Sequence, residues 1–320
     1  MQYLILGGGP AGIVIATDET EAPYLRPLLP DLILGEARDE TILDPQGQDL
    51  AEKGVRLATG RRAVRLDTGT RRVDFSDGTR EGYDVLLIAT GGKPDVPAPL
   101  GKDLPAIRVF DSREDALAIK ERAARPGIAV IYGPGYLAIE ACRALRRKKK
   151  EVVWIKPDLP KYGYPIAGEL EASILDDVRN RGARILEGED IGLAREKDAD
   201  VTVVLARGGE EIPCSLLVIA TERVPSVGFL AGSGVTAGMG VLVDDFLRTS
   251  VPNVYAAGDC AEFADNPKGV GRINFGWRSA IRQGQMAGEN MAGGNKRFGG
   301  NEGDYFWALF GFSLLDRAKK

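Results

Sequence analysis

The chain has 320 residues, a formal net charge of −4 at pH 7 and no histidine. The lack of histidine removes the commonest general base and the commonest transition-metal ligand, which disfavours Ser-His hydrolysis and predicts no metal site. The slightly acidic charge leaves no basic footprint for a nucleic acid, and no apolar run approaches the roughly 18 residues that span a bilayer. Met1 leads straight into a predicted strand, and the three cysteines are far apart, so we expect a cytoplasmic protein without a disulfide framework.

The first predicted element is an apolar strand that ends in a glycine fingerprint. Tyr3–Leu6 leads into Gly7, Gly9 and Gly12. In a strand–turn–helix unit, such glycines let the main chain approach a pyrophosphate, which binds backbone N–H groups at the helix N-terminus. The glycines therefore predict a dinucleotide site.

The segment after this fingerprint is too short for such a unit. The strand-like stretch Ile13–Ala16 follows Gly12 directly, whereas a parallel crossover needs roughly 10–12 residues. Asp18 and Glu19 come six and seven positions after Gly12, instead of about 20. The two strands can be parallel neighbours only if chain is missing between Gly12 and Val14. Either the sequence omits a segment there, or the protein has lost its first phosphate-binding helix.

A second fingerprint follows the predicted strand Ile128–Tyr132. It consists of Gly133, Gly135 and Ala138, and alanine is an allowed variant at the third position. A predicted helix begins there and runs to about residue 148. Two such fingerprints predict two dinucleotides that face each other, the arrangement in which a nicotinamide passes hydride to a flavin.

The strand after this helix, residues 151–155, is followed by Lys156. NAD-specific proteins usually carry an acid at this place for the ribose hydroxyls, whereas a cation suits the 2′-phosphate of NADP. Lys156 therefore favours NADPH slightly over NADH. The alternative is an ordinary exposed lysine.

Four further segments carry a family resemblance. They are YDVLLIATGGKP (Tyr83–Pro94), LLVIATERVP (Leu216–Pro225), TSVPNVYAAGD (Thr249–Asp259) and RINFGWRSAIRQGQMAGENMAGG (Arg272–Gly294). In this unbroken order, over roughly residues 1–295, the chain resembles the two-dinucleotide-binding-domain flavoproteins, or pyridine nucleotide-disulphide oxidoreductases. It is most similar to the branch that contains NADH oxidases, rubredoxin reductases and the flavin-binding part of nitrite reductases.

The resemblance implies an α/β fold of two Rossmann-like domains, the second inserted in the first. We expect a discontinuous FAD-binding domain from residues 1–105 and 236–295, and an NAD(P)-binding domain from residues 106–235. Residues 296–320 would be the remnant of a truncated third domain. This apolar tail would either pack on the body or form an interface for a homodimer or a partner subunit.

The resemblance also implies roles for single residues near the flavin. Asp259, after Gly258, would hold the ribityl chain of FAD. Trp277 would begin a helix whose positive end stabilises the reduced flavin. Thr90 and Gly91 would lie beside the FAD, with an ordinary turn as the alternative.

Two catalytic candidates rest on the same resemblance. Arg26, before Pro27, matches a basic residue on the flavin side, and Glu140 matches an acid near the nicotinamide; each is otherwise a surface residue. Glu222 replaces the glycine of the second A-T-G-like turn, where a carboxylate would repel a pyrophosphate and weaken nicotinamide binding.

No C-x-x-C or C-x-x-x-x-C pair occurs, and Gly35–Asp44 contains no cysteine. Relatives that reduce disulfides or peroxides need such cysteines. We therefore predict an FAD-dependent NAD(P)H oxidoreductase without a redox-active disulfide. Its electrons would go to dioxygen, another small molecule, or an iron–sulfur or rubredoxin-type partner. The rival interpretations are a degenerate, non-catalytic nucleotide-binding or scaffold member of the fold, and a flavin-holding subunit of a larger enzyme.

Overall fold

The computed structural model describes residues 3–9, 12–44, 47, 49–97, 100, 104–158, 168–197, 199–263 and 272–299. The chain divides into two compact units. Unit 1 comprises residues 1–24, 44–93 and 224–320, and unit 2 comprises residues 25–43 and 94–223. The apolar tail at 301–320, for which we expected either packing on the body or an interface, lies outside the described residues.

These units differ from the expected domain boundaries. The chain passes from unit 1 to unit 2 within β8 (Gly92–Pro94) and returns to unit 1 within β17 (Arg223–Pro225). Each of these two boundaries lies twelve residues earlier than expected. Packing explains the shift, because Val96 and Leu100 join the core of unit 2, whereas Phe229 joins the core of unit 1. Residues 25–43 were expected in the FAD-binding domain, but they belong to unit 2.

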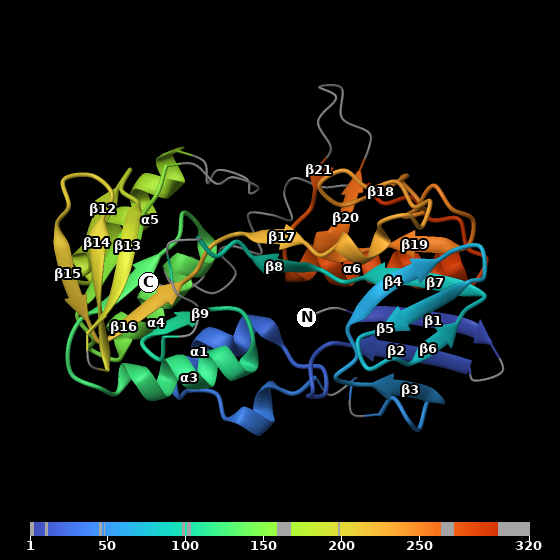
Figure 1. Ribbon diagram of the computed structural model, residues 1–320, viewed down its shortest axis with the longest axis horizontal. Coiled ribbons are helices and arrows are strands. Elements are labelled where there is room, and N and C mark those ends of the chain that lie inside the picture. The colour runs from blue at the N-terminus through green and yellow to red at the C-terminus, as the bar shows by residue number, and fades with distance from the viewer. Residues whose placement is uncertain are drawn as a thin grey trace, which may run out of the picture. The chain divides into compact units, whose positions relative to one another are not determined.

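A five-stranded sheet forms the centre of unit 1, in the order β19-β7-β1-β2-β3 (Figure 1). Its strands are β1 (Tyr3–Gly9), β2 (Gly12–Thr17), β3 (Val55–Ala58), β7 (Val85–Ala89) and β19 (Val254–Ala256). β19 is parallel to β7, and β2 is parallel to β3. β1 is antiparallel to both of its neighbours, with Leu4 opposite Ala16 on one side and Ile88 on the other.

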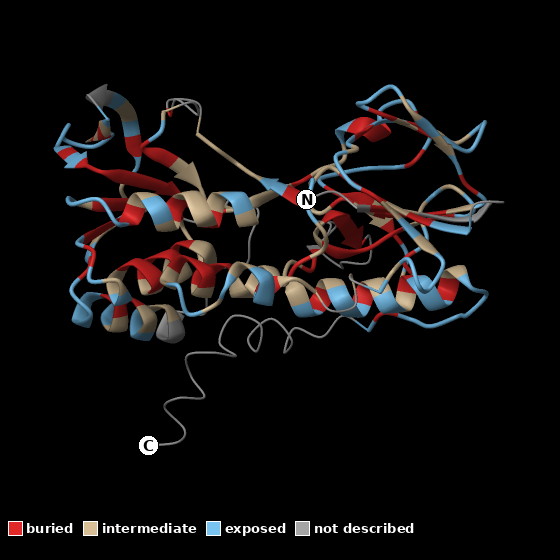
Figure 2. Cartoon of the chain, turned by 90° about the horizontal axis from the view of Figure 1, so that it is seen from below, coloured by how far each residue is buried: buried red, intermediate tan, exposed pale blue. Residues whose placement is uncertain are grey.

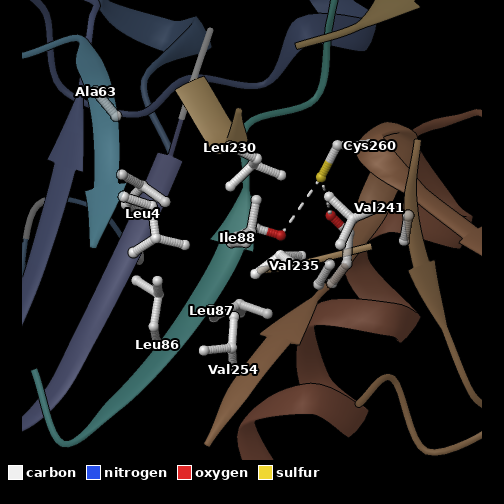
Figure 3. Packing of buried hydrophobic residues seen from close by; sticks show 14 of the residues in the cluster. Leu4, Ala63, Leu86, Leu87, Ile88, Leu230, Val235, Val241, Val254 and Cys260 are labelled. Carbon is white, nitrogen blue, oxygen red and sulfur yellow. Dashed lines mark hydrogen bonds between the residues drawn. The ribbon is translucent and has the colours of Figure 1, made fainter. Parts of the chain in front are cut away.

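Smaller elements complete unit 1. They are an antiparallel sheet of β4 (Ala63–Asp67), β5 (Arg72–Phe75) and β6 (Arg80–Gly82), a sheet of β18 (Val241–Val243), β20 (Ala261–Phe263) and β21 (Arg272–Ile273), the 3-10 helices η3 (Gly228–Leu230) and η4 (Gly258–Cys260), and helix α6 (Trp277–Met291). β7 lies at the centre of the core, where Leu86 and Ile88 are fully buried and Ile88 accepts a hydrogen bond from the Cys260 thiol (Figure 3).

Unit 2 contains a parallel sheet in the order β12-β11-β10-β16-β9. Its strands are β9 (Ile107–Val109), β10 (Ala129–Tyr132), β11 (Val152–Lys156), β12 (Arg184–Glu187) and β16 (Leu216–Ile219). All residues of β10 and β16 are buried, as in a parallel sheet that is covered on both faces (Figure 2).

Helices and a second sheet surround these strands. They are α1 (Leu29–Leu34), α3 (Arg113–Ala123), α4 (Tyr136–Arg147), α5 (Gly168–Asn180), the 3-10 helices η1 (Arg26–Leu28) and η2 (Asp39–Ile42), and the antiparallel strands β13 (Ile191–Lys197), β14 (Asp200–Leu205) and β15 (Glu211–Cys214). α3 begins with a capping box in which Ser112 and Asp115 bind each other's backbone N–H. Among the described helices, none has the length and apolar character of a membrane span.

Candidate functional site

The second fingerprint lies at the carboxyl end of β10, in the middle of the parallel sheet of unit 2. β10 ends at Tyr132, and α4 begins at Tyr136 with Gly135 as its N-cap residue. No side chain of the described residues caps this helix end. Free N–H groups and the helix dipole at such an end bind an anion, so the strand, turn and helix form a phosphate-binding geometry.

Glycine is present at the two positions of this turn for different reasons. A Cβ atom on Gly133 would lie 2.1 Å from the carbonyl oxygen of Ala220, so the fold itself requires glycine there. A Cβ atom on Gly135 would meet no atom within 4 Å, so space is left beside the helix end. Ala138, at the third position of the fingerprint, is fully buried. The turn thus fits the pyrophosphate of a dinucleotide.

A buried hydroxyl beside the turn supports this fit. Thr221 follows β16, and its Oγ1 is buried without a hydrogen-bond partner among the described residues. The backbone nitrogen of Thr221 would lie 3.3 Å from a Cβ atom on Gly133. Buried hydroxyls are normally hydrogen-bonded, so an orphaned one next to the fingerprint suits a polar ligand. Glu222, the next residue, is half-buried, and its carbonyl oxygen accepts the Asp95 N–H at 2.9 Å.

Trp154 holds the turn from the neighbouring strand, a role that the sequence analysis missed. It lies on β11, is 1% exposed, and its indole N–H donates to the carbonyl oxygen of Gly133 at 2.8 Å. A buried tryptophan usually needs a partner for this N–H. A single tryptophan in the apolar strand that follows the fingerprint helix was the available signal.

Lys156 lies next to the fingerprint at the end of β11. The preceding residue, Ile155, pairs with Tyr132, and its carbonyl oxygen accepts the Gly133 N–H at 3.2 Å. The Lys156 ammonium lies 2.8 Å from Glu171 Oε1 on α5, and its side chain is only 15% exposed. Lys156 is therefore not an ordinary exposed lysine. Glu171 was not singled out from the sequence, because it lies on the next helix.

Glu140 lies one turn into α4, and Arg143 binds its carboxylate. The Arg143 guanidinium donates to Glu140 Oε2 through Nε at 2.9 Å and Nη2 at 2.7 Å, and also pairs with Asp31 of α1 at 3.5 Å. Burial raises the pKa of Glu140, and Arg143 opposes this shift. Burial also raises the pKa of Tyr136 at the start of the same helix.

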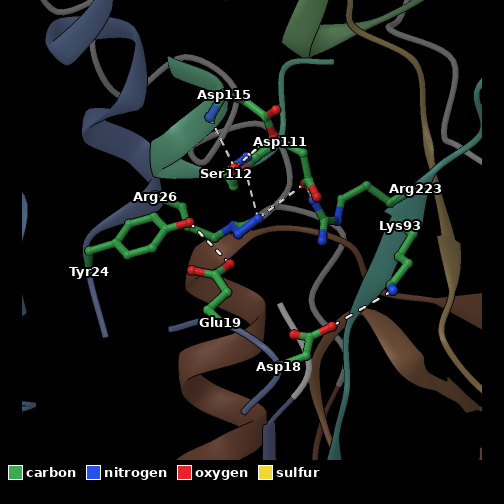
Figure 4. A network of polar contacts seen from close by, with 9 residues as sticks. All are labelled: Asp18, Glu19, Tyr24, Arg26, Lys93, Asp111, Ser112, Asp115 and Arg223. Atoms are coloured by element: carbon green, nitrogen blue, oxygen red, sulfur yellow. Dashed lines mark hydrogen bonds and ion pairs between the residues drawn. The ribbon is translucent and has the colours of Figure 1, made fainter. Parts of the chain in front are cut away.

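Arg26 lies in unit 2, in an ion pair that the sequence did not predict. Its guanidinium donates to the Asp111 carboxylate at 3.1 Å and to the Asp111 carbonyl oxygen at 2.8 Å (Figure 4). Arg223 pairs with the same carboxylate. With the pair of Arg113 and Asp39, these contacts explain why residues 25–43 join unit 2.

The first fingerprint forms a hairpin instead of a strand–turn–helix unit. β1 ends at Gly9, β2 begins at Gly12, and these two residues face each other in an antiparallel pair. The strand–turn–helix unit of which such glycines are typical is therefore not formed at Gly7, Gly9 and Gly12, as the short connection had indicated, because a two-residue connection can join only antiparallel strands. The described residues of this hairpin therefore offer no helix N-terminus to the pyrophosphate of FAD.

The other flavin-side candidates gather at one edge of the unit 1 sheet. Thr90 and Gly91 follow β7, and Asp259 follows β19; because these strands are parallel neighbours, their carboxyl ends meet. Asp259 Oδ1 accepts the N–H of Gly276, the N-cap residue of α6, at 3.0 Å, and half-buried Trp277 is the first residue of that helix.

Backbone geometry explains the glycines at this edge. Gly91 and Gly258 have φ values of 55° and 79°, which favour glycine. The Gly258 N–H donates to Gln283 at 2.8 Å, and the Thr90 hydroxyl donates to the Ser226 carbonyl oxygen at 2.9 Å. This edge thus brings Thr90, Gly91 and Asp259 together, and their contact with the ribityl chain of FAD stays a prediction.

Comparisons with known proteins agree with this fold. A family model described as pyridine nucleotide-disulphide oxidoreductase matches residues 1–288. The chain is 31% identical over 280 residues to the 5,5'-dehydrodivanillate O-demethylase ferredoxin reductase subunit of Sphingobium sp., covering 81% of this chain and 67% of that protein. It is 27% identical over 312 residues to the NADH-rubredoxin oxidoreductase of Clostridium acetobutylicum, covering 91% and 75%.

A solved structure shows the same fold. The ferredoxin reductase for the CYP199A2 system of Rhodopseudomonas palustris aligns with a TM-score of 0.81 at 24% identity, over 90% of this chain and 71% of that one. The predicted α/β fold of two Rossmann-like domains is confirmed. The chain therefore belongs to the pyridine nucleotide-disulphide oxidoreductase family, whose members bind FAD and NAD(P)H.

Proposed function

We propose that unit 2 binds NAD(P)H through Gly133, Gly135 and Ala138, and that the protein is an FAD-dependent NAD(P)H oxidoreductase. The observation that carries this proposal is the open space beside Gly135 at the uncapped start of α4. The orphaned Thr221 hydroxyl and the Trp154 contact with Gly133 support it. Lys156 gives the site a slight preference for NADPH, since it ends the strand whose preceding residue, Ile155, accepts the Gly133 N–H.

FAD, when bound, supplies the group that accepts hydride from the nicotinamide. Unit 1 offers it Asp259, Trp277, Thr90 and Gly91 at one sheet edge. Its described residues form no helix N-terminus at the first fingerprint, so we expect FAD to be held weakly. Arg26 and Glu140 remain candidates for catalytic roles, and their ion pairs with Asp111 and Arg143 would fix their positions.

The proposed final acceptor is a ferredoxin- or rubredoxin-type protein or a small molecule such as dioxygen. The names of the relatives, a ferredoxin reductase subunit and an NADH-rubredoxin oxidoreductase, support the first class. A thiol route is disfavoured, because all three cysteines are buried and burial raises the pKa of each.

The second candidate is a nucleotide-binding protein of this fold that has lost catalysis. The hairpin at Gly9 and Gly12 favours it, because the helix that would bind the FAD pyrophosphate is not formed. In this case unit 2 would still bind NAD(P)H.

Flavin content and nucleotide binding decide between the two candidates. The purified protein is first weighed by intact mass against the expected 34.4 kDa, then incubated with excess FAD, desalted and examined for flavin absorbance. Anaerobic bleaching of that absorbance by NADPH or NADH supports the oxidoreductase. A colourless protein that binds NADPH supports the second candidate, and a protein that binds neither nucleotide overturns both.

A further inference from the structure

The ion pair between Lys156 and Glu171 lies at the end of β11, and in dinucleotide-binding folds the residue at this place contacts the adenosine ribose. Lys156 ends β11, and the Gly133 N–H of the fingerprint bonds to the carbonyl oxygen of the residue before it. Glu171 Oε1 lies 2.8 Å from the Lys156 ammonium. The side chains are 15% and 32% exposed, so solvent screens this pair only in part.

We propose that Glu171 is a specificity-determining residue that restrains the preference of Lys156 for a 2′-phosphate. This inference rests on the proposed binding of NAD(P)H by unit 2. Lys156 alone would present one full positive charge to the ribose, whereas the Lys156–Glu171 pair is neutral as a whole. The site then prefers NADPH only slightly, instead of selecting it strongly over NADH.

Charge and hydrogen bonding give the physical reason. A phosphate monoester carries about −1.5 to −2 charges at pH 7, so it must share the ammonium with the Glu171 carboxylate and is repelled by it. Ribose hydroxyls are neutral donors and are not repelled by a carboxylate. Another acid near Lys156 is Glu187, which faces it in the neighbouring strand and is paired with Arg179. Glu171 is thus the acid that competes directly for the Lys156 ammonium.

Binding of 5′-AMP and 2′,5′-ADP tests this role without flavin and without turnover. The dissociation constants of both ligands are measured by titration calorimetry for the wild type, Glu171→Gln and the control Asp176→Asn. Asp176 lies on the same helix, is 71% exposed and pairs with Arg179, so its substitution removes one negative charge without freeing Lys156. We expect Glu171→Gln to raise the affinity ratio of 2′,5′-ADP to 5′-AMP about tenfold, and Asp176→Asn to leave it unchanged.

A double-substitution cycle shows whether the effect passes through Lys156. In a Lys156→Gln background, Glu171→Gln should change the ratio by less than about twofold. An equal gain from Glu171→Gln and Asp176→Asn, or a full gain without Lys156, overturns the role of Glu171. If both ligands bind to the wild type but Glu171→Gln leaves their ratio unchanged, the inference fails and the proposed function stands. If neither ligand binds to the wild type, the proposed function fails as well.

Discussion

The carbonyl oxygen of Ala220 occupies the position where a side chain on Gly133 would begin, 2.1 Å from the ideal Cβ atom. Ala220 follows β16, and its own N–H donates to the carbonyl oxygen of Tyr132 at 2.7 Å. Two adjacent parallel strands are therefore locked together at the point where the phosphate-binding turn starts. The position of the turn depends on this contact between backbones.

This contact predicts opposite outcomes for the two glycines of the turn. Gly133→Ala should lower the free energy of unfolding by about 3 kcal/mol, because neither backbone can move aside without breaking the sheet. Gly135→Ala should change it by less than about 1 kcal/mol, but should weaken NADPH binding at least about tenfold by filling the ligand's space. Denaturant unfolding and titration calorimetry measure both effects. Undiminished NADPH affinity in a folded Gly135→Ala variant would contradict the proposed site.

Trp154 offers a second test of the turn. Trp154→Phe keeps an aromatic ring in the core but leaves the Gly133 carbonyl oxygen without its buried donor, which should cost about 1–3 kcal/mol of stability. NADPH binding should weaken several-fold, since the turn loses its support. A matched control is Trp277→Phe, at the start of α6 in unit 1, which should leave NADPH affinity unchanged. Equal losses in the two variants would rule out a local role for Trp154.

Asp259 has a structural contact and a proposed cofactor role, which two substitutions separate. Asp259→Ala removes the acceptor of the Gly276 N–H and should lower the free energy of unfolding by about 1–2 kcal/mol. Asp259→Asn keeps an oxygen acceptor and should recover most of that loss. If the carboxylate binds the ribityl chain, both variants should retain less FAD than the wild type after reconstitution and desalting. FAD retention that is the same in all three proteins would disprove the cofactor role.

Burial raises the pKa of the Cys214 thiol to about 12, which predicts both its reactivity and a dependence of stability on pH. At pH 8 the native thiol is protonated, so a thiol reagent should label none of the three buried cysteines until the protein unfolds. From about pH 9 to about pH 12 the unfolded state releases this proton first. It then binds fewer protons than the native state, and the free energy of unfolding falls as pH rises.

The comparison with Cys214→Ala isolates this contribution. The wild type should lose stability more steeply than the variant above pH 9, by up to about 1.4 kcal/mol per pH unit. Denaturant unfolding at several pH values measures the two slopes. Identical slopes, or rapid labelling of the native protein at pH 8, would show that the thiol is not buried as described.

Local patterns in the sequence predicted the parts of the site that depend on neighbouring residues. The run from Ile128 through Gly135 combines an apolar strand with a turn that requires glycine at Gly133, and both appear where expected. Contacts between distant residues were not predictable in this way. Arg26 and Asp111 are 85 positions apart, so nothing local indicated that residues 25–43 would join unit 2. Glu171 likewise reaches Lys156 only because α5 packs against α4 and β12.

The sequence predicted only one part of the connection between β1 and β2. The short connection between Leu6 and Ile13 left no room for a helix-containing crossover unless chain is missing there. It did not indicate whether the second strand would leave the first or pair with it in the antiparallel direction. Antiparallel pairing of β2 with β1 keeps Leu4 and Val14 buried in the core of unit 1. If β2 left β1 instead, these side chains would lose this burial. Burial of apolar surface, at about 25 cal/mol per Å², therefore favours the antiparallel pairing.

The antiparallel pairing also changes the order in which unit 1 is expected to fold. A hairpin closed by two residues forms within about 1–10 μs, because its contacts are local and little chain entropy is lost. β1 lies between β2 and β7 in the sheet, so this early pair would present an edge on which the distant β7 and then β19 could assemble. A central strand that normally awaits long-range pairing would thus be among the first to form, and the slow step would move to the docking of residues 85–89.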